Sequence, residues 1–183
     1  MELESVDLAV RGRIVTMDKD RTVIDDGMAV SRAGRILAVG PRQEIASRFR
    51  CDQVVGDAHS IIMPGFVDAH THCTQCFVRS LTSGELPMIP RIYSPAQRSL
   101  NPEQAATTVR LIAAQLLRSG ITTMCEGTLN PAHEPAIVEA IEETGIRCVM
   151  ARGAADQDFH HAALYSQIAD RSWYKAREGQ AEK

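Results

Sequence analysis

The sequence predicts an α/β fold made of two parts. The first 60 of its 183 residues are rich in β-branched side chains and contain no long helical pattern. From residue 61 onward, apolar strand-like runs alternate with amphipathic helical segments, which is typical of βαβ units around a parallel sheet. We therefore expect residues 1–60 to form part of a small β-sandwich domain, and residues 61–183 to form a second domain built on parallel strands.

The N-terminal part is predicted to consist of short strands and one helical turn. Apolar residues alternate on both sides of Ala33-Gly34, which predicts a hairpin over residues 28–40. Residues 41–50 predict a short helix. Further strands are expected at residues 7–17 and near Val54 and Val55.

The second part opens with the apolar run IIMPGFV at residues 61–67, which predicts one strand covered on both faces. A well-delimited helix follows at 101–120, where Asn101 is a candidate N-cap, Gln104 can complete a capping box and Gly120 suits a left-handed end. The remaining predicted elements are a strand at 121–127, a helix at 133–145, a strand at 146–153 and weak helical character at 162–182.

The segment from Thr74 to Leu100 is too long for an ordinary connection, and such loops are usually functional or disordered. Its apolar residues favour an ordered segment, which we expect to pack over the end of the first strand as a lid. Its candidate substrate contacts, with solvated charge as the default interpretation, are Arg79, Glu85 and Arg91.

Two histidines follow the first apolar run. Side chains alternate between the faces of a strand, so Asp68, His70 and His72 are expected to point one way and Thr71 the other. Two imidazoles on one face can share a cation, and zinc favours such nitrogen ligands. On spacing alone they can equally be polar residues of an exposed strand. Asp68 could orient an imidazole, or it could be a solvated or capping residue.

The stretch MPGFVDAHTH, preceded by β-rich residues and followed by a long loop and SGITTMCEG, resembles the amidohydrolase superfamily. More narrowly, it is similar to the branch that holds guanine, cytosine and S-adenosylhomocysteine deaminases and triazine hydrolases. The resemblance covers essentially the whole chain. It implies the opening strands of a (β/α)8 TIM-type barrel and a catalytic metal, Zn²⁺ or alternatively Fe²⁺, with His70 and His72 as ligands.

The same resemblance implies hydrolytic deamination or dechlorination of a small nitrogen heterocycle, of purine, pyrimidine or triazine type, by metal-activated water. Hydrolysis of a cyclic or linear amide or urea is a neighbouring alternative. A non-catalytic truncated homologue, or a subunit that binds a partner chain, is the alternative from another class. A homo-oligomer is also expected, although no residue specifies the number of subunits.

The chain departs from the family pattern in one respect. The family takes its remaining metal ligands and proton carriers from the fifth, sixth and eighth barrel strands, whereas roughly three of the eight strands are recognisable here. A catalytic zinc takes three protein ligands and a water. We therefore expect the site to need the remaining barrel segment, either in cis or from another chain.

Four further residues are candidates for the site. Glu126, at the end of the second barrel strand, and His133, just after it, are predicted substrate contacts. An ion pair explains Glu126 equally well, and His133 could instead lie in solvent at a helix start. Cys73 and Cys76 form a CxxC, but no second CxxC exists, so we interpret them as incidental thiols that could line a pocket.

Composition excludes several other classes of protein. The formal net charge of −3 provides no electrostatic case for nucleic acid or an anionic membrane as partner. No apolar run reaches the roughly 18 residues of a membrane span, and the acidic N-terminus is unlike a secretory signal. Five scattered cysteines favour reduced thiols, so a cytoplasmic location is expected.

Overall fold

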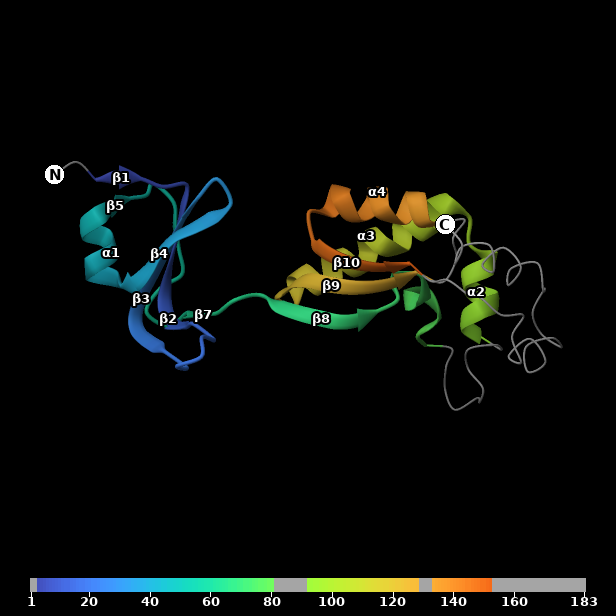
Figure 1. The fold of residues 1–183 in the computed structure, drawn as a ribbon, viewed down its shortest axis with the longest axis horizontal. Helices are drawn as coiled ribbons and strands as arrows, with labels where there is room; N and C mark the ends of the chain where they lie inside the picture. The colour runs from blue at the N-terminus through green and yellow to red at the C-terminus, as the bar shows by residue number, and fades with distance from the viewer. Residues whose placement is uncertain (1–2, 81–91, 129–132, 153–183) are drawn as a thin grey trace. The chain divides into compact units, whose positions relative to one another are not determined.

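The computed structural model describes residues 3–80, 92–128 and 133–152. The chain divides into two compact units, Met1–Pro64 and a second one that begins at Gly65 (Figure 1). The division falls four residues after the expected position between residues 60 and 61. The reason is that strand β7 (Ile61–Ile62) pairs with the first unit.

The first unit is built on a five-stranded sheet with the order β4-β3-β2-β6, in which β7 also pairs with β2. Its strands are β2 (Leu8–Val15), β3 (Val23–Arg32), β4 (Arg35–Pro41), β6 (Val54–Val55) and β7. A separate two-stranded sheet joins β1 (Glu4–Ser5) to β5 (Phe49–Arg50). The predicted strands at 7–17 and 54–55 are thereby confirmed.

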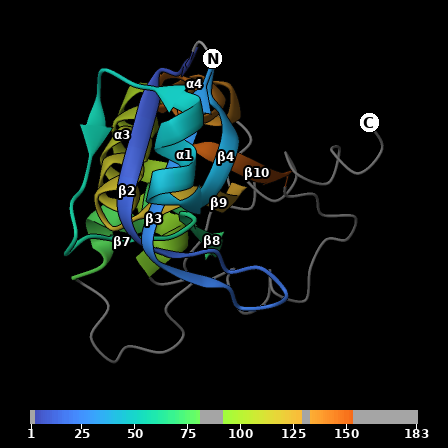
Figure 2. The same cartoon turned by 90° about the vertical axis from the view of Figure 1, so that its left-hand side faces the viewer.

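The predicted hairpin and short helix of this unit are also confirmed. β3 and β4 pair antiparallel around Ala33 and Gly34, whose φ angles of 49° and 73° are those a tight hairpin turn requires. Helix α1 (Arg42–Arg48) packs on β3 and β4 (Figure 2). Its buried side chain is that of Ile45. The apolar core beneath it consists of Val6, Ala9, Met28, Val30, Ile45 and Phe49.

The single strand predicted over residues 61–67 is wrong. Two strands occur instead: β7 in the first unit and β8 (Phe66–Thr71) in the second. Pro64, which has no N–H to donate to a ladder, lies between them. At Gly65 a Cβ would collide with the side chain of Thr122, so the chain enters β8 at a position where only glycine fits.

The second unit contains a parallel three-stranded sheet with the order β10-β9-β8 (Figure 1). Strands β9 (Ile121–Thr128) and β10 (Arg147–Arg152) alternate with helices α3 (Pro102–Arg118) and α4 (Glu134–Thr144) as predicted. Both helices pack on one face of the sheet. The core between them and the sheet comprises Cys73, Ala105, Ala106, Val109, Ala113, Met124, Ile137, Ala140, Ile141 and Ile146.

The boundaries of α3 and α4 follow from local chemistry. The Asn101 side chain accepts a hydrogen bond from the Gln104 backbone N–H at 2.9 Å, and the Gln104 side chain accepts one from the Asn101 N–H at 2.9 Å. This is the predicted capping box. Gly120 and Gly145 follow the helices with φ angles of 81° and 70°, a left-handed conformation that glycine adopts without steric cost.

The long connection after β8 is described only at its two ends. It begins with the 3₁₀ helix η1 (Cys73–Val78) and finishes with α2 (Ser94–Ser99). A buried hydrogen bond of 2.8 Å from Gln97 Nε2 to Thr74 Oγ1 joins these two helices. Residues 81–91, with Glu85 and Arg91, lie outside the described residues, as does the weak helix expected at 162–182. The lid stays a prediction.

None of the helices in the described ranges is both long enough and apolar enough to cross a membrane.

Candidate metal centre

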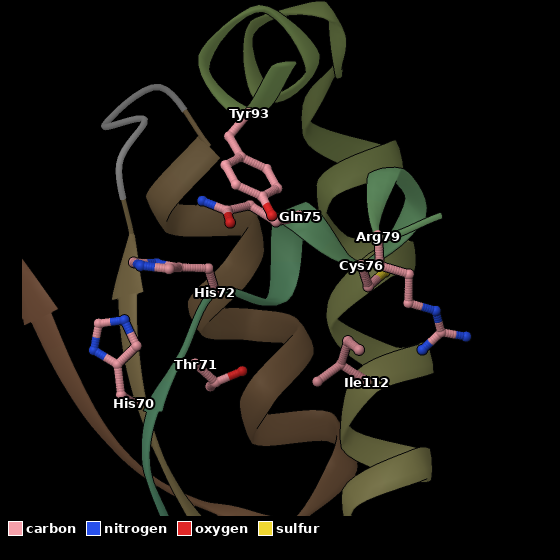
Figure 3. Close-up of a pocket in the computed structure, with 8 residues that line it drawn as sticks. All are labelled: His70, Thr71, His72, Gln75, Cys76, Arg79, Tyr93 and Ile112. Carbon is pink, nitrogen blue, oxygen red and sulfur yellow. The ribbon is translucent and has the colours of Figure 1, made fainter. Parts of the chain in front are cut away.

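The two histidines after the apolar run lie side by side at the carboxyl end of β8. The ring centroids of His70 and His72 are 4.9 Å apart, and their planes make an angle of 87°. Figure 3 shows both rings on one side of the strand and the Thr71 side chain on the other. The alternation predicted for these three residues is thus the one observed.

Asp68 does not share the face of the histidines. In the register between β8 and β9, Asp68 lies level with Met124 and Thr71 with Glu126, so one extra residue of β8 is accommodated between them. This irregularity puts Asp68 on the same face as Thr71, and the face predicted for Asp68 is wrong. Its Oδ1 accepts a hydrogen bond of 3.2 Å from the His70 backbone N–H, which is a local capping contact.

The His72 ring is oriented by the neighbouring strand. Its Nδ1 lies 2.6 Å from the carbonyl oxygen of Gly127. A carbonyl oxygen can only accept, so Nδ1 is the donor, and in the neutral ring Nε2 then carries the lone pair. A Cβ on Gly127 would lie 3.0 Å from His72 Cε1, so this approach suits glycine. A ring N–H held by a carbonyl with the other nitrogen available is the usual arrangement of a metal-binding histidine.

A pocket of about 290 Å³ adjoins the histidine pair. Figure 3 shows Tyr93 reaching from the α2 side toward Gln75, while Arg79 is directed away from the histidines. Arg79 Nη1 donates a hydrogen bond of 3.2 Å to Gln115 Oε1. The lining residues are His70, Thr71, His72, Gln75, Cys76, Arg79, Tyr93 and Ile112.

Glu126 lies beside the pair but does not line this pocket. Its side chain is 1% exposed, and its Oε2 accepts a hydrogen bond of 2.8 Å from the backbone N–H of Cys73. The residue therefore holds the backbone immediately after His72. Its contact with substrate stays a prediction.

His133 is buried at the start of α4, with 5% of its surface exposed, so the alternative of a solvent-exposed position is wrong. Burial lowers the pKa of its imidazole, and a backbone hydrogen bond involving Leu100 opposes this effect. It is not one of the residues that line the pocket. A contact between His133 and substrate stays a prediction.

The CxxC cysteines have different surroundings. Cys73 is fully buried in the core between helices and sheet, whereas Cys76 lines the pocket. Burial raises the pKa of both thiols, and the proximity of Glu126 raises that of Cys73 further. A raised pKa favours the neutral thiol over the thiolate that binds metals. The interpretation as incidental thiols stays a prediction.

Comparison with known families adds to this geometry. Residues 61–182 match the amidohydrolase family. The chain belongs to this family. One curated relative is the 5-methylthioadenosine/S-adenosylhomocysteine deaminase of Nitratidesulfovibrio vulgaris strain Hildenborough. The two sequences are 35% identical over 139 residues, which cover 74% of this chain and 30% of that protein. The corresponding deaminase of Lawsonia intracellularis is 33% identical over 138 residues, with coverages of 74% and 30%. The chain thus spans less than a third of the length of these relatives.

Solved structures of similar fold include a deaminase and a chlorohydrolase. A zinc-bound adenosine deaminase from Xanthomonas campestris has a TM-score of 0.76 at 23% identity, covering 98% of this chain and 40% of that one. Atrazine chlorohydrolase TrzN from Arthrobacter aurescens TC1, a mutant complexed with zinc and atraton, has a TM-score of 0.66 at 21% identity, with coverages of 82% and 36%. These likenesses confirm the α/β fold.

The donors present in this amidohydrolase suit one part of a catalytic metal site. Neutral imidazole nitrogens bind zinc and ferrous iron well, and His70 and His72 offer two of them. A catalytic zinc takes three protein ligands. Within the described ranges, no group of three or more His, Cys, Asp or Glu side chains could hold a metal ion. The pair therefore fits as two ligands of a site that needs at least one more donor.

Sequence reasoning did not single out three of the residues around this pocket. Gln75 and Tyr93 lie at the two ends of the long connection, in η1 and at the start of α2, and their proximity depends on how these two helices pack together. Ile112 fits the apolar spacing of α3, which predicted burial without indicating a pocket. The only signal available was the position of the long loop directly after the histidines.

Proposed function

We propose that the protein is a metal-dependent amidohydrolase that deaminates or dechlorinates a nitrogen heterocycle, with His70 and His72 as two of its metal ligands. The observation that carries the proposal is the adjacency of the two rings, 4.9 Å apart, together with the bond that directs His72 Nδ1 to Gly127. Neither contact is needed to bury apolar surface. Both suit two imidazoles that share a cation.

The proposed architecture is the opening of a (β/α)8 barrel preceded by part of a β-sandwich. Three parallel strands with helices on one face suit this fold, and catalytic groups of such barrels lie at the carboxyl ends of strands, as His70 and His72 do. By their pairing with Thr123 and Cys125, which alternate with the buried Met124, Val67 and Val149 lie on the opposite face, where both side chains are exposed. We infer that further strands cover this face, supplied in cis or by another chain.

The metal would be zinc, with ferrous iron as the alternative. Zinc is supported by its presence in the adenosine deaminase and the chlorohydrolase of similar fold. When bound, such a cation supplies Lewis-acid activation of water at neutral pH. This chain would contribute two neutral imidazole nitrogens from one strand, and the carbonyl group of Gly127 would keep the proton of His72 on Nδ1.

A purine is the substrate type that the relatives support best, because the curated relatives are deaminases of adenine nucleosides by name. The pocket offers the Tyr93 hydroxyl and the Gln75 amide, which can donate to and accept from ring nitrogens, and Ile112 as an apolar wall. Deamination of such a substrate releases ammonia and leaves a carbonyl on the ring.

A cytoplasmic location completes the proposal. It is supported by the odd number and the scatter of the five cysteines, which favour reduced thiols over a disulfide framework. A homo-oligomer remains an expectation, which native mass spectrometry of the purified protein would test.

Metal content and hydrolysis test the proposal together. Protein purified together with the barrel segment that completes the site, in cis or as a second chain, is loaded with Zn²⁺ or Fe²⁺. It is assayed for ammonia release from adenine nucleosides, for chloride release from a chlorotriazine and for opening of a cyclic amide. The variants are His70→Ala and His72→Ala, with His59→Ala as matched control because His59 is exposed in the first unit. We expect metal binding and hydrolysis to fall in the first two variants only. Stoichiometric metal without turnover of any substrate would favour the non-catalytic alternative.

A further inference from the structure

We propose that Glu126 is a positioning residue for His72, acting through the backbone N–H of Cys73. The inference goes beyond the expected substrate contact of Glu126. It rests on the proposed function only insofar as His72 is a metal ligand.

The contacts form a two-point attachment between adjacent residues. Gly127 accepts from His72 Nδ1 at 2.6 Å, and Glu126 Oε2 accepts from the Cys73 N–H at 2.8 Å. Thus two successive residues of β9 hold two successive residues after β8. One bond holds the imidazole ring and the other holds the backbone that carries it.

The bond from Glu126 replaces a ladder bond that the strand no longer makes. The paired register of β8 and β9 ends at Thr71, which lies level with Glu126. Cys73 then begins η1, and the first N–H groups of a helix have no acceptor within that helix. Because Cys73 is 0% exposed, water does not reach this amide. The carboxyl group of Glu126 provides the acceptor, from a side chain that is itself buried.

Loss of the bond between Glu126 and the Cys73 N–H would affect His72, because the chain changes direction at His72. His72 has φ −133° and ψ 89°, between an extended strand and a 3₁₀ helix. If the Cys73 amide were released, this junction would be free to move and the ring would lose its place against Gly127. A carbonyl that accepts from Nδ1 selects the tautomer with Nε2 unprotonated, which is the form that binds a metal through Nε2.

A purely structural role of Glu126 makes a different prediction. If the role were purely structural, replacing Glu126 would lower the stability of the second unit. It would change neither the tautomer of His72 nor the affinity of the protein for metal. The matched control is Gln97→Ala, because Gln97 is also buried and also holds η1, through its 2.8 Å bond to Thr74. Gln97 does not line the pocket.

The experiment compares Glu126→Ala, Glu126→Gln and Gln97→Ala with the unchanged protein. Zinc affinity is measured by competition with a chromophoric chelator, and the His72 tautomer by ¹⁵N NMR of the metal-free protein. In the unchanged protein we expect the His72 tautomer that carries its proton on Nδ1. In Glu126→Ala we expect a mixture of tautomers and about 10- to 100-fold weaker zinc binding. In Gln97→Ala we expect neither change. Glu126→Gln should lose less, because its amide oxygen can accept the same bond.

The two readouts separate this proposal from the proposed function. If the unchanged protein binds no zinc even when the remaining barrel segment is present, the proposed function fails, and the tautomer alone decides the role of Glu126. Unchanged tautomer and affinity in Glu126→Ala overturn the positioning role. If Glu126→Ala does not fold, Glu126→Asp takes its place: its carboxyl group is one methylene too short to keep the bond, so an unchanged tautomer there overturns the role equally.

Discussion

At the scale of single residues, the candidate metal centre depends on how closely the His72 ring can approach the backbone of Gly127. His72 lies against Gly127 with its Nδ1 2.6 Å from the carbonyl oxygen. A methyl group at position 127 would sit 3.0 Å from Cε1 and 3.4 Å from Nδ1, which is tighter than ordinary van der Waals contact. The absence of a side chain at Gly127 is therefore part of the site.

Gly127→Ala should displace the His72 ring and weaken zinc binding by about 10- to 100-fold, the usual effect of losing an outer-shell partner of a ligand. Isothermal titration with Zn²⁺ measures the affinity. Gly145→Ala is the control: its φ of 70° makes alanine strained, at a cost of about 1 kcal/mol, yet no atom lies within 4 Å of the added Cβ. Equal affinities in both variants would contradict the role of Gly127.

His133 makes a second residue-scale prediction, on pH. Burial lowers the pKa of its folded-state imidazole below the ordinary value of 6.5. The unfolded chain therefore binds more protons between these two pKa values, so the free energy of unfolding falls as pH decreases from about 6.5. In His133→Gln this dependence should be weaker, as measured by urea unfolding at pH 7.5 and pH 5. His59→Gln, at an exposed site, should keep the full dependence.

At this scale, sequence reasoning succeeded where the cause was local. The shared direction of His70 and His72 follows from the alternation of a strand, and it needs no knowledge of neighbours. The prediction of the face on which Asp68 lies failed, because the irregular register arises from pairing with β9, which is distant in sequence. The bond from Glu126 to Cys73 was equally inaccessible, because 53 residues separate its partners.

At the scale of elements, α3 shows how local signals define a helix. Its N-terminus carries both bonds of a capping box, and its apolar side chains Ala105, Val109 and Ala113 are buried at helical spacing. These signals lie within one stretch of sequence, so the helix was predictable to within two residues. The break between β7 and β8 was not, since the pairing of Ile61 and Ile62 with β2 decides it.

Asn101→Ala should lower the free energy of unfolding by about 1 kcal/mol, because it removes the acceptor for the Gln104 N–H. Chemical denaturation followed by circular dichroism measures this loss. Glu139→Ala, at an exposed position of α4, is the control and should change stability by less than about 0.5 kcal/mol. A loss as small in Asn101→Ala as in the control would mean that the capping box does not stabilise α3.

At the scale of the whole molecule, the two faces of the β8–β9–β10 sheet are unequal. One face is covered by α3 and α4, and its core residue Met124 is fully buried. On the other face Val67 and Val149 are 62% and 63% exposed. The register sets Gly127, and with it the His72 ring, on this uncovered face. Whatever covers the apolar side chains therefore also borders the histidine pair.

Residues 1–183 prepared alone should bind a hydrophobic dye such as ANS and self-associate through this face, because exposed apolar sheet surface favours association. The double variant Val67→Thr, Val149→Thr keeps β-branched residues in both strands, and it should lower dye binding and the associated fraction in analytical ultracentrifugation. Leu111→Ser is the control, because Leu111 is 50% exposed on α3 rather than on the sheet. If the control lowers association as much as the double variant, the sheet face is not the surface that needs a cover. The inferred covering strands would then lose their main structural support.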